Sequence, residues 1–279
     1  MRIGIVGLGL IGGSLGLDLS YLGFKVLGVS RKEKTCNLAL EMGVADETST
    51  SLSLLKNAEI VFICTPIGAI ASTIKQLIPF LSPQTIITDV GSVKTSIVTE
   101  CSQLWHNFLG GHPMAGKAEN GIEVAEKNLF VNAAYVLTPT PKTPKETVKK
   151  LTEIVHLLGA NLSICTPEEH DRAVAWISHV PVMISASLIH ACMQEGETTV
   201  LELAKKLASS GFRDTSRVGG GNWELGLMMA QYNRQKLLQS LNQYRQSLDE
   251  IINNIEQEDW QKLELLLKAT NQARSQFLK

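Results

Sequence analysis

The chain has 279 residues, of which 44% are hydrophobic, and a formal net charge of −1. This length suits two domains with a sizeable core. A nucleic-acid or membrane-surface partner would call for a basic excess, so we expect neither. No run of 18 uninterrupted apolar residues occurs, so we expect no membrane span.

The N-terminus and the cysteines indicate a cytoplasmic protein. Residues 1–7 combine a positive charge with apolar residues, but no small-residue cleavage site follows, which argues against a signal peptide. The five cysteines are odd in number and form no C-x-x-C motif. We therefore expect a reducing compartment and free thiols.

The first 166 residues alternate short β-rich runs with helical patterns. Most of the β-rich runs are continuously apolar, as expected for parallel strands covered on both faces. This alternation predicts an α/β fold with an open, doubly wound sheet, forming a first domain over residues 1–166. The predicted strands are 2–7, 25–29, 60–64, 85–90, 134–138 and 161–165. The predicted helices are 10–22, 33–42, 67–80, 94–106 and 144–158.

Residues 167–279 show helical periodicity and almost no strand signal, which predicts an all-helical second domain. Residues 167–194 form one long predicted helix, bent near Pro181. Apolar stripes over 237–255 and 260–267 predict two amphipathic helices. These stripes can be buried within the domain or against a second copy, so homodimerisation is a hypothesis.

The sequence Gly7-Leu8-Gly9-Leu10-Ile11-Gly12 follows the first predicted strand and begins a helix. Alone, this glycine pattern is a weak signal, but the start of a βαβ unit is its proper context. Gly7 would permit the tight turn, Gly9 the approach of a pyrophosphate, and Gly12 close helix–strand packing. The motif predicts a dinucleotide site at the helix N-terminus. The alternative is a glycine-rich turn without a ligand.

The end of the second predicted strand bears on which dinucleotide binds. An NAD enzyme usually has an acid there, but this chain has Ser30-Arg31-Lys32. An acid would repel the 2′-phosphate of NADP, whereas the Ser30 hydroxyl and the Arg31 guanidinium would bind it. Thr35 is near enough to add a hydroxyl. We therefore predict NADP, the alternative being a basic, solvated start of a helix.

Three further segments follow strands at the edge where an open α/β sheet places its ligand, namely Thr65-Pro66, residues 89–94 and residues 110–116. His112 lies among glycines and a proline rather than on an apolar helix face. This setting favours a catalytic histidine over a core histidine.

In the helical region, Arg213 and Arg217 are four residues apart and share a face if the segment is helical. Paired guanidinium groups suit carboxylate recognition, although a surface ion-pair cluster is the alternative. We interpret the remaining histidines, His106, His156, His170 and His190, as structural or surface residues. No His/Cys/Asp/Glu set has metal-ligand spacing, so we expect no metal.

Taken together, these motifs resemble those of the prephenate/arogenate dehydrogenase family. The matching segments are Gly7–Gly12, Thr65-Pro66, Asp89–Lys94, Gly111–Gly116, Ser178–Pro181 and Gly211–Arg217, in the family's order. The resemblance implies a Rossmann domain, a helical dimerisation domain and an active site in the cleft between them. Because two such domains account for 279 residues, we expect no appended chorismate mutase or regulatory domain.

The resemblance also implies a reaction. Hydride leaves C4 of a cyclohexadiene for the nicotinamide as CO₂ leaves C1, and the ring becomes aromatic. His112 matches the family's catalytic histidine, which acts as a neutral hydrogen-bond acceptor and general base. Ser92 matches a serine that orients this histidine and the substrate hydroxyl. The implied substrate-binding residues are Arg217 for the carboxylate, His179, Arg213 and Lys94.

Two departures from the family bear on the substrate. Many prephenate-using members have a histidine where this chain has Val182, and several have an acid where it has Ala118. The chain most resembles compact NADP-dependent arogenate dehydrogenases, so we expect arogenate to be converted to tyrosine. Alternatives are prephenate dehydrogenase, β-hydroxyacid dehydrogenase and a non-enzymatic NADP sensor, which would not need His112, Ser92 and Arg217 together.

Overall fold

A computed structural model describes residues 1–117 and 119–277 of the chain, and Ala118 lies outside the described residues. Contacts divide the chain into two units, residues 1–233 and 234–279, which we describe separately. The predicted division after residue 166 falls inside the first unit and stays a prediction.

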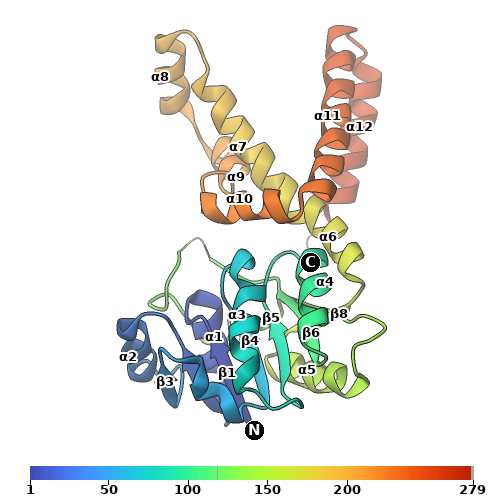
Figure 1. Cartoon of the computed structure of the whole chain (residues 1–279). Coiled ribbons are helices and arrows are strands. Elements are labelled where there is room, and N and C mark those ends of the chain that lie inside the picture. The colour runs from blue at the N-terminus through green and yellow to red at the C-terminus, as the bar shows by residue number, and fades with distance from the viewer. Residues whose placement is uncertain (118, 278–279) are drawn as a thin grey trace. The chain divides into compact units, whose positions relative to one another are not determined.

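The first unit contains a single eight-stranded sheet (Figure 1). Its strand order is β3-β2-β1-β4-β5-β6-β7-β8, and every adjacent pair is parallel except β6 and β7. The predicted doubly wound α/β sheet is confirmed. The strands are β1 (Arg2–Val6), β2 (Lys25–Val29), β3 (Glu47–Ser49), β4 (Ile60–Ile63), β5 (Ile86–Asp89), β6 (Phe108–Pro113), β7 (Ala134–Thr138) and β8 (Asn161–Ile164).

The sequence analysis missed two of these strands. β3 is a three-residue, polar strand that pairs only with β2 at the edge of the sheet, so it carries no apolar run. β6 ends in Gly-Gly-His-Pro, and glycine and proline are depleted in strand interiors. All six residues of β6 are nevertheless buried. His112 therefore lies on a strand rather than in the loop that its neighbours suggest.

Helices cover both faces of the sheet, because the side chains of each strand alternate between two apolar clusters. In β4, Ile60 and Phe62 join one cluster, whereas Val61 and Ile63 join the other. The first cluster includes residues of α1 (Leu10–Tyr21), α2 (Glu33–Glu41) and α5 (Lys145–Leu157). The second includes residues of α3 (Ile70–Leu77) and α4 (Thr95–Leu104), and 3₁₀ turns occupy Leu52–Asn57, Ile67–Ala69 and Ile78–Phe80.

Residues 167–193 form one continuous helical stretch, close to the prediction of 167–194. It consists of α6 (Pro167–Val174), a π-helical turn (Ala175–His179) and α7 (Val180–Met193). The irregular turn precedes Pro181, whose missing N–H and ring disturb the hydrogen bonding of the turn before it. π-helical turns are frequent at functional sites, and this one ends at His179.

By length and composition alone, the stretch Pro167–Met193 could cross a membrane. Its first turns argue for a different environment. A capping box between Thr166 and Glu169 begins the helix, and the buried residues His170 and Asp171 hydrogen-bond to the sheet domain. These polar contacts tie the start of the stretch to the Rossmann sheet.

The remaining helices of the first unit are α8 (Thr198–Leu207), α9 (Ser210–Ser216) and α10 (Trp223–Tyr232). The second unit consists of α11 (Arg234–Glu256) and α12 (Trp260–Arg274), as its two apolar stripes predict. Several of these stripe residues are exposed within the chain, namely Leu238, Leu248, Ile252, Ile255, Trp260, Leu265 and Leu267.

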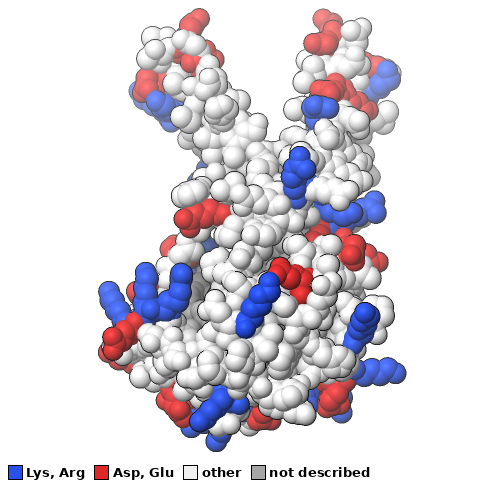
Figure 2. Space-filling view, in the orientation of Figure 1, with Lys and Arg blue, Asp and Glu red and all other residues white. Residues whose placement is uncertain are grey.

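Charged side chains are of mixed sign on the surface. On the face shown in Figure 2, basic and acidic residues are interspersed. This view is consistent with the near-neutral net charge.

The turn between β1 and α1 depends on two glycines. Gly7 has a φ of +98°, a conformation that L side chains rarely adopt. A Cβ at Gly12 would lie 2.0 Å from the carbonyl oxygen of Gly7, so the helix can approach the strand only without a side chain there. A Cβ at Gly9, by contrast, would have no heavy atom within 4 Å.

We predict that Gly12→Ala destabilises the folded chain, whereas Gly9→Ala does not. The added methyl group at position 12 would collide with backbone, and overpacking of this kind costs about 1–3 kcal/mol. Thermal unfolding monitored by circular dichroism should show a lower midpoint for Gly12→Ala alone. Equal midpoints for the two variants would show that the close helix–strand approach contributes nothing to stability.

Candidate active site

Four parallel strands of the sheet end at the same edge and bring the predicted segments together. β1 leads into Gly7, β4 into Thr65, β5 into residues 89–94, and β6 carries His112 near its end. In open α/β sheets, ligands bind at this carboxyl edge, where the strand order reverses. Here β1 lies between β2 and β4, which makes this position the reversal point.

A pocket of about 760 Å³ opens at this edge, beside the β1–α1 turn. It collects eight of the predicted cofactor residues, namely Gly7, Leu8, Gly9, Ser30, Arg31, Thr35, Thr65 and Pro66. Leu10, Ile11 and Gly12 do not line it, because they form the first turn of α1.

The donor set of this pocket fits an anionic dinucleotide. Gly9 leaves open space where a phosphate can approach the backbone, and the N-terminus of α1 points N–H groups there. The Thr65 hydroxyl is buried and lacks a hydrogen-bond partner among the described residues. A buried unpaired hydroxyl is costly, so a ligand that binds it relieves a real penalty.

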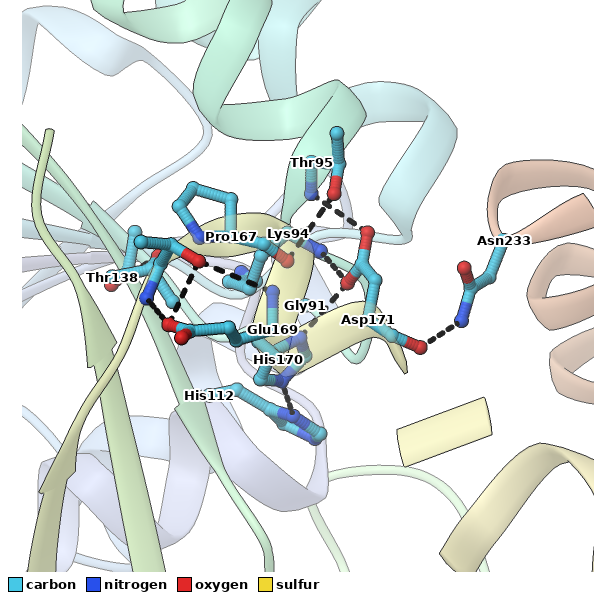
Figure 3. Close-up of polar contacts among 12 residues, drawn as sticks. Gly91, Lys94, Thr95, His112, Thr138, Pro167, Glu169, His170, Asp171 and Asn233 are labelled. Atoms are coloured by element: carbon cyan, nitrogen blue, oxygen red, sulfur yellow. Dashed lines mark hydrogen bonds and ion pairs between the residues drawn. The ribbon is translucent and has the colours of Figure 1, made fainter. Parts of the chain in front are cut away.

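His112 is 8% exposed and lies on β6 opposite Val136 of β7. Its Nδ1 atom is 2.8 Å from Nε2 of His170, and the two rings meet edge to face (Figure 3). Burial, followed by the charges of His170, Lys94 and His179, holds the pKa of His112 well below 6.5. The imidazole is therefore neutral near pH 7, as a general base requires.

His170 is the main site residue that the sequence analysis missed. It is 2% exposed, and its Nδ1 atom is 2.8 Å from Oδ1 of Asp171 (Figure 3). His170 is therefore not a surface residue, and the sequence analysis did not place it directly behind His112. His106, His156 and His190 are exposed. The sequence signal for His170 was the capping-box sequence Thr166–Glu169, which places it in the first turn of α6.

Asp171 links α6 to the N-terminus of α4. Its Oδ1 atom accepts a hydrogen bond from the Lys94 N–H at 2.7 Å, and its Oδ2 atom accepts one from the Thr95 N–H at 2.8 Å. Burial raises the pKa of Asp171, but hydrogen bonds from His170, Thr95 and Lys94 outweigh burial and lower it. The carboxylate is thus ionised and caps a helix of the sheet domain.

Lys94, predicted to bind substrate, makes its side-chain contacts inside the protein. Its side chain is fully buried, and its ammonium pairs with the Asp89 carboxylate and donates to the Gly111 carbonyl at 2.8 Å. Asp89 in turn accepts from the Gly111 N–H at 3.2 Å. Burial lowers the pKa of Lys94, and Asp89 opposes that decrease. The pair holds the end of β5 to β6, one residue before His112.

His179 is also buried, with no exposed surface. Its Nδ1 atom is 3.1 Å from Nδ2 of Asn233, and its Nε2 atom has no partner among the described residues. Burial lowers the pKa of His179 to about 4, while Asp171 opposes the decrease. His179 is therefore a neutral ring with one unsatisfied nitrogen.

Ser92 retains a free polar atom near the end of β5. Its Oγ atom is buried and has no partner among the residues that the structure describes. No Ser92–His112 hydrogen bond is present within this part of the chain, and the hydrogen bond of His112 to His170 uses its Nδ1 atom. The Ser92 hydroxyl thus remains available to a ligand.

The two predicted arginines have different environments. Arg213 is on α9, where its exposed side chain pairs with Asp214 at 3.1 Å. This contact corresponds to the alternative of a surface ion pair, and substrate binding by Arg213 stays a prediction. Arg217 directly follows α9 and is exposed. α9 is anchored to α7 by a 2.6 Å hydrogen bond from Ser185 to the Thr215 carbonyl.

No group of three or more His, Cys, Asp or Glu residues with metal-binding geometry occurs within residues 1–117 and 119–277.

Comparison with known proteins places these features in a family. Residues 15–164 match the nucleotide-binding domain of prephenate dehydrogenase, and residues 166–269 match its dimerization domain. Prephenate dehydrogenase from Bacillus subtilis is 34% identical over 266 residues, covering 93% of this chain and 71% of that protein.

Solved structures agree with this relationship. The crystal structure of Synechocystis arogenate dehydrogenase is 55% identical, with a TM-score of 0.91 and full coverage of both chains. The prephenate dehydrogenase from A. aeolicus, in complex with hydroxyphenyl propionate and NAD⁺, is 26% identical with a TM-score of 0.94, covering 99% of this chain and 98% of that one. The fold, the motifs and these relatives together show that the chain belongs to the prephenate dehydrogenase family.

Proposed function

We propose that this oxidoreductase converts arogenate to tyrosine by oxidative decarboxylation with NADP⁺ as hydride acceptor. The observation that carries the proposal is the buried, neutral His112, held by His170 at the carboxyl edge of a dinucleotide-binding sheet. The Synechocystis arogenate dehydrogenase, 55% identical over the whole chain, supports arogenate as the substrate.

His112 acts as the general base. Its free Nε2 atom accepts the proton of the substrate C4 hydroxyl as the C4–H bond breaks and the C1 carboxylate leaves as CO₂. The Ser92 hydroxyl, buried and unpaired, orients the substrate hydroxyl toward His112. The bound nicotinamide supplies the hydride acceptor. Positioned general bases typically contribute about 10²–10⁴-fold in rate.

Arg217 and His179 hold the substrate. A guanidinium grips a carboxylate with two parallel hydrogen bonds, which suits Arg217 to the carboxylate groups of the substrate. The unsatisfied Nε2 atom of His179 offers a further polar contact. Val182 is half-buried on α7, three residues after His179, where prephenate-using members often carry a histidine. An apolar residue there favours arogenate.

Arg31 and Ser30 select NADP⁺ over NAD⁺. Both line the dinucleotide pocket at the end of β2, together with Lys32 and Thr35, and no acid follows Val29. Such a basic and hydroxyl-rich strand end suits a 2′-phosphate. The A. aeolicus relative binds NAD⁺, so the cofactor choice rests on these residues of this chain.

The runner-up is prephenate dehydrogenase activity giving 4-hydroxyphenylpyruvate. The B. subtilis relative, described as a prephenate dehydrogenase, favours it. The two substrates differ in the side-chain amine or keto group, and His112, Ser92 and Arg217 serve both. We place the enzyme in the cytoplasm, in line with its free cysteines.

A four-way steady-state assay tests substrate and cofactor together. For the wild type we expect the highest kcat/KM with arogenate and NADP⁺. In Arg31→Ala, kcat/KM with NADP⁺ should fall about 10- to 100-fold, because a hydrogen bond to a charged group is worth about 1.5–3 kcal/mol. NAD⁺ kinetics should change little. Lys34→Ala is the matched control, because Lys34 is an exposed basic residue three positions after Arg31, in the first turn of α2, and does not line the pocket. A wild-type preference for NAD⁺ or prephenate would refute the corresponding part of the proposal.

The pH profile tests the protonation state of His112. The neutral ring is the active form, so kcat/KM declines only as the pH falls through the pKa of His112. Because that pKa is well below 6.5, we expect a flat profile from pH 8 down through 6.5 and an acidic limb below it. His112→Asn should lose about 10²–10⁴-fold in kcat with an unchanged dinucleotide Kd. An acidic limb centred above pH 6.5 would contradict the buried, neutral base.

We further infer a homodimer, supported by the match to a dimerization domain and by the exposed apolar residues of α11 and α12. Apolar stripes of this kind normally mark association surfaces. Sedimentation equilibrium should give twice the 30.4 kDa protomer mass. A mass of 30.4 kDa at every micromolar concentration would show that the protein is a monomer and contradict this inference.

A further inference from the structure

One hydrogen-bond network connects two buried histidines of the site, His112 and His179, which we call the pocket histidines. Asp171 lies at its centre. The side chain of Asp171 bonds to His170, which bonds to His112, and the carbonyl of Asp171 accepts from Asn233 (Figure 3). Asn233 also bonds to His179. His170 and Asp171 lie on α6, and Asn233 lies at the end of α10. None of the three was predicted as a site residue from the sequence.

The first branch determines where His112 carries its proton. The ionised Asp171 carboxylate can only accept, so the His170 Nδ1 atom donates to it at 2.8 Å. In the network that we infer, Nε2 of His170 carries no proton and accepts. The facing Nδ1 atom of His112, 2.8 Å away, then carries the proton. The Nε2 atom of His112 is left as an acceptor.

The second branch determines the proton of His179. The Asn233 amide faces the Asp171 carbonyl at 2.8 Å, and a carbonyl can only accept. The amide must therefore present its NH₂ group there, which settles its orientation. The second hydrogen of the same NH₂ group points to Nδ1 of His179 at 3.1 Å. The neutral ring of His179 thus accepts at Nδ1 and carries its proton on Nε2.

We propose that the Asp171 network assigns opposite roles to the Nε2 atoms of the pocket histidines, a proton acceptor in His112 and a hydrogen-bond donor in His179. This inference rests on the proposed function and deepens it. His170, Asp171 and Asn233 are positioning residues for the reaction.

The assigned roles match what the reaction needs. A base must take the C4 hydroxyl proton, and only a bare Nε2 atom on His112 can do so. The substrate carries carboxylate oxygens, which only accept, and the Nε2–H group of His179 would donate to one of them. This nitrogen is buried and unpaired within the described residues, so a substrate oxygen would satisfy it.

The test reads the ring protons directly. Enzyme labelled with ¹⁵N-histidine has six histidines, and long-range ¹H–¹⁵N spectra at pH 8 distinguish protonated from bare ring nitrogens. In the wild type we expect the proton of His112 on Nδ1 and that of His179 on Nε2. His112 protonated on Nε2, or His179 protonated on Nδ1, would overturn the proposal whatever the activity. If the ring protons lie where we expect but the enzyme turns over neither arogenate nor prephenate, the proposed function is wrong and the proton assignment stands.

Variants separate positioning from mere packing. His170→Leu removes the acceptor for His112, so kcat should fall at least about tenfold with KM nearly unchanged, and the ring proton of His112 should move from Nδ1 to Nε2. His170→Gln restores an acceptor oxygen and should recover most of the rate. His156→Gln, at an exposed position, is the control and should change nothing. Equal losses in the Leu and Gln variants, with unchanged ring protons, would show a purely structural role.

Asn233→Asp tests the second branch. A carboxylate cannot donate to Nδ1 of His179, so the proton of that ring should move to Nδ1, and the substrate KM should rise about tenfold with less effect on kcat. Asn161→Asp is the matched control, since Asn161 is an exposed asparagine whose amide also donates to a backbone carbonyl. Retention of the proton on Nε2 of His179 in Asn233→Asp would overturn this branch.

Discussion

The site depends on one carboxylate, that of Asp171, at the N-terminus of α4. It accepts from two backbone N–H groups of the sheet domain and from His170, so one side chain both caps a helix and orients the imidazole behind His112. Helix N-termini favour negative charge, and this keeps the carboxylate ionised inside the protein. Removing it would leave three donors without their acceptor, at about 1–3 kcal/mol for each buried group. Stability and catalytic geometry are therefore coupled here.

The buried pair of Asp89 and Lys94 serves a similar purpose on the neighbouring strand. Breaking such a pair is costly, yet forming it adds little stability, because both ions lose their hydration. Its contribution is geometric: Lys94 and Asp89 bind the carbonyl and the N–H of Gly111. The backbone of Gly111, directly before His112, is thereby fixed through both its carbonyl and its N–H group.

Local patterns account for what the sequence predicted well. The β1–α1 turn, the apolar strands and the long helices each follow from neighbouring residues, and they are confirmed. The dinucleotide pocket also gathers the residues predicted from short motifs. What was missed depends on distant partners. β6 is a strand because β5 and β7 flank it, despite its glycines and proline. Lys94 is polar in sequence but buried by its pairing with Asp89, and nothing near His170 in the chain reveals that His112 lies against it.

The same contrast explains how the site divides its tasks. Cofactor residues lie within a few positions of strand ends, so a substitution there acts locally on dinucleotide binding. The catalytic histidine is controlled by His170 and Asp171, 58 and 59 positions away in sequence, which reach it only when α6 docks on α4. Burial makes His112 neutral, but burial alone cannot choose which nitrogen carries the proton. That choice requires a directional acceptor, and His170 supplies it because Asp171 holds the proton of its other nitrogen.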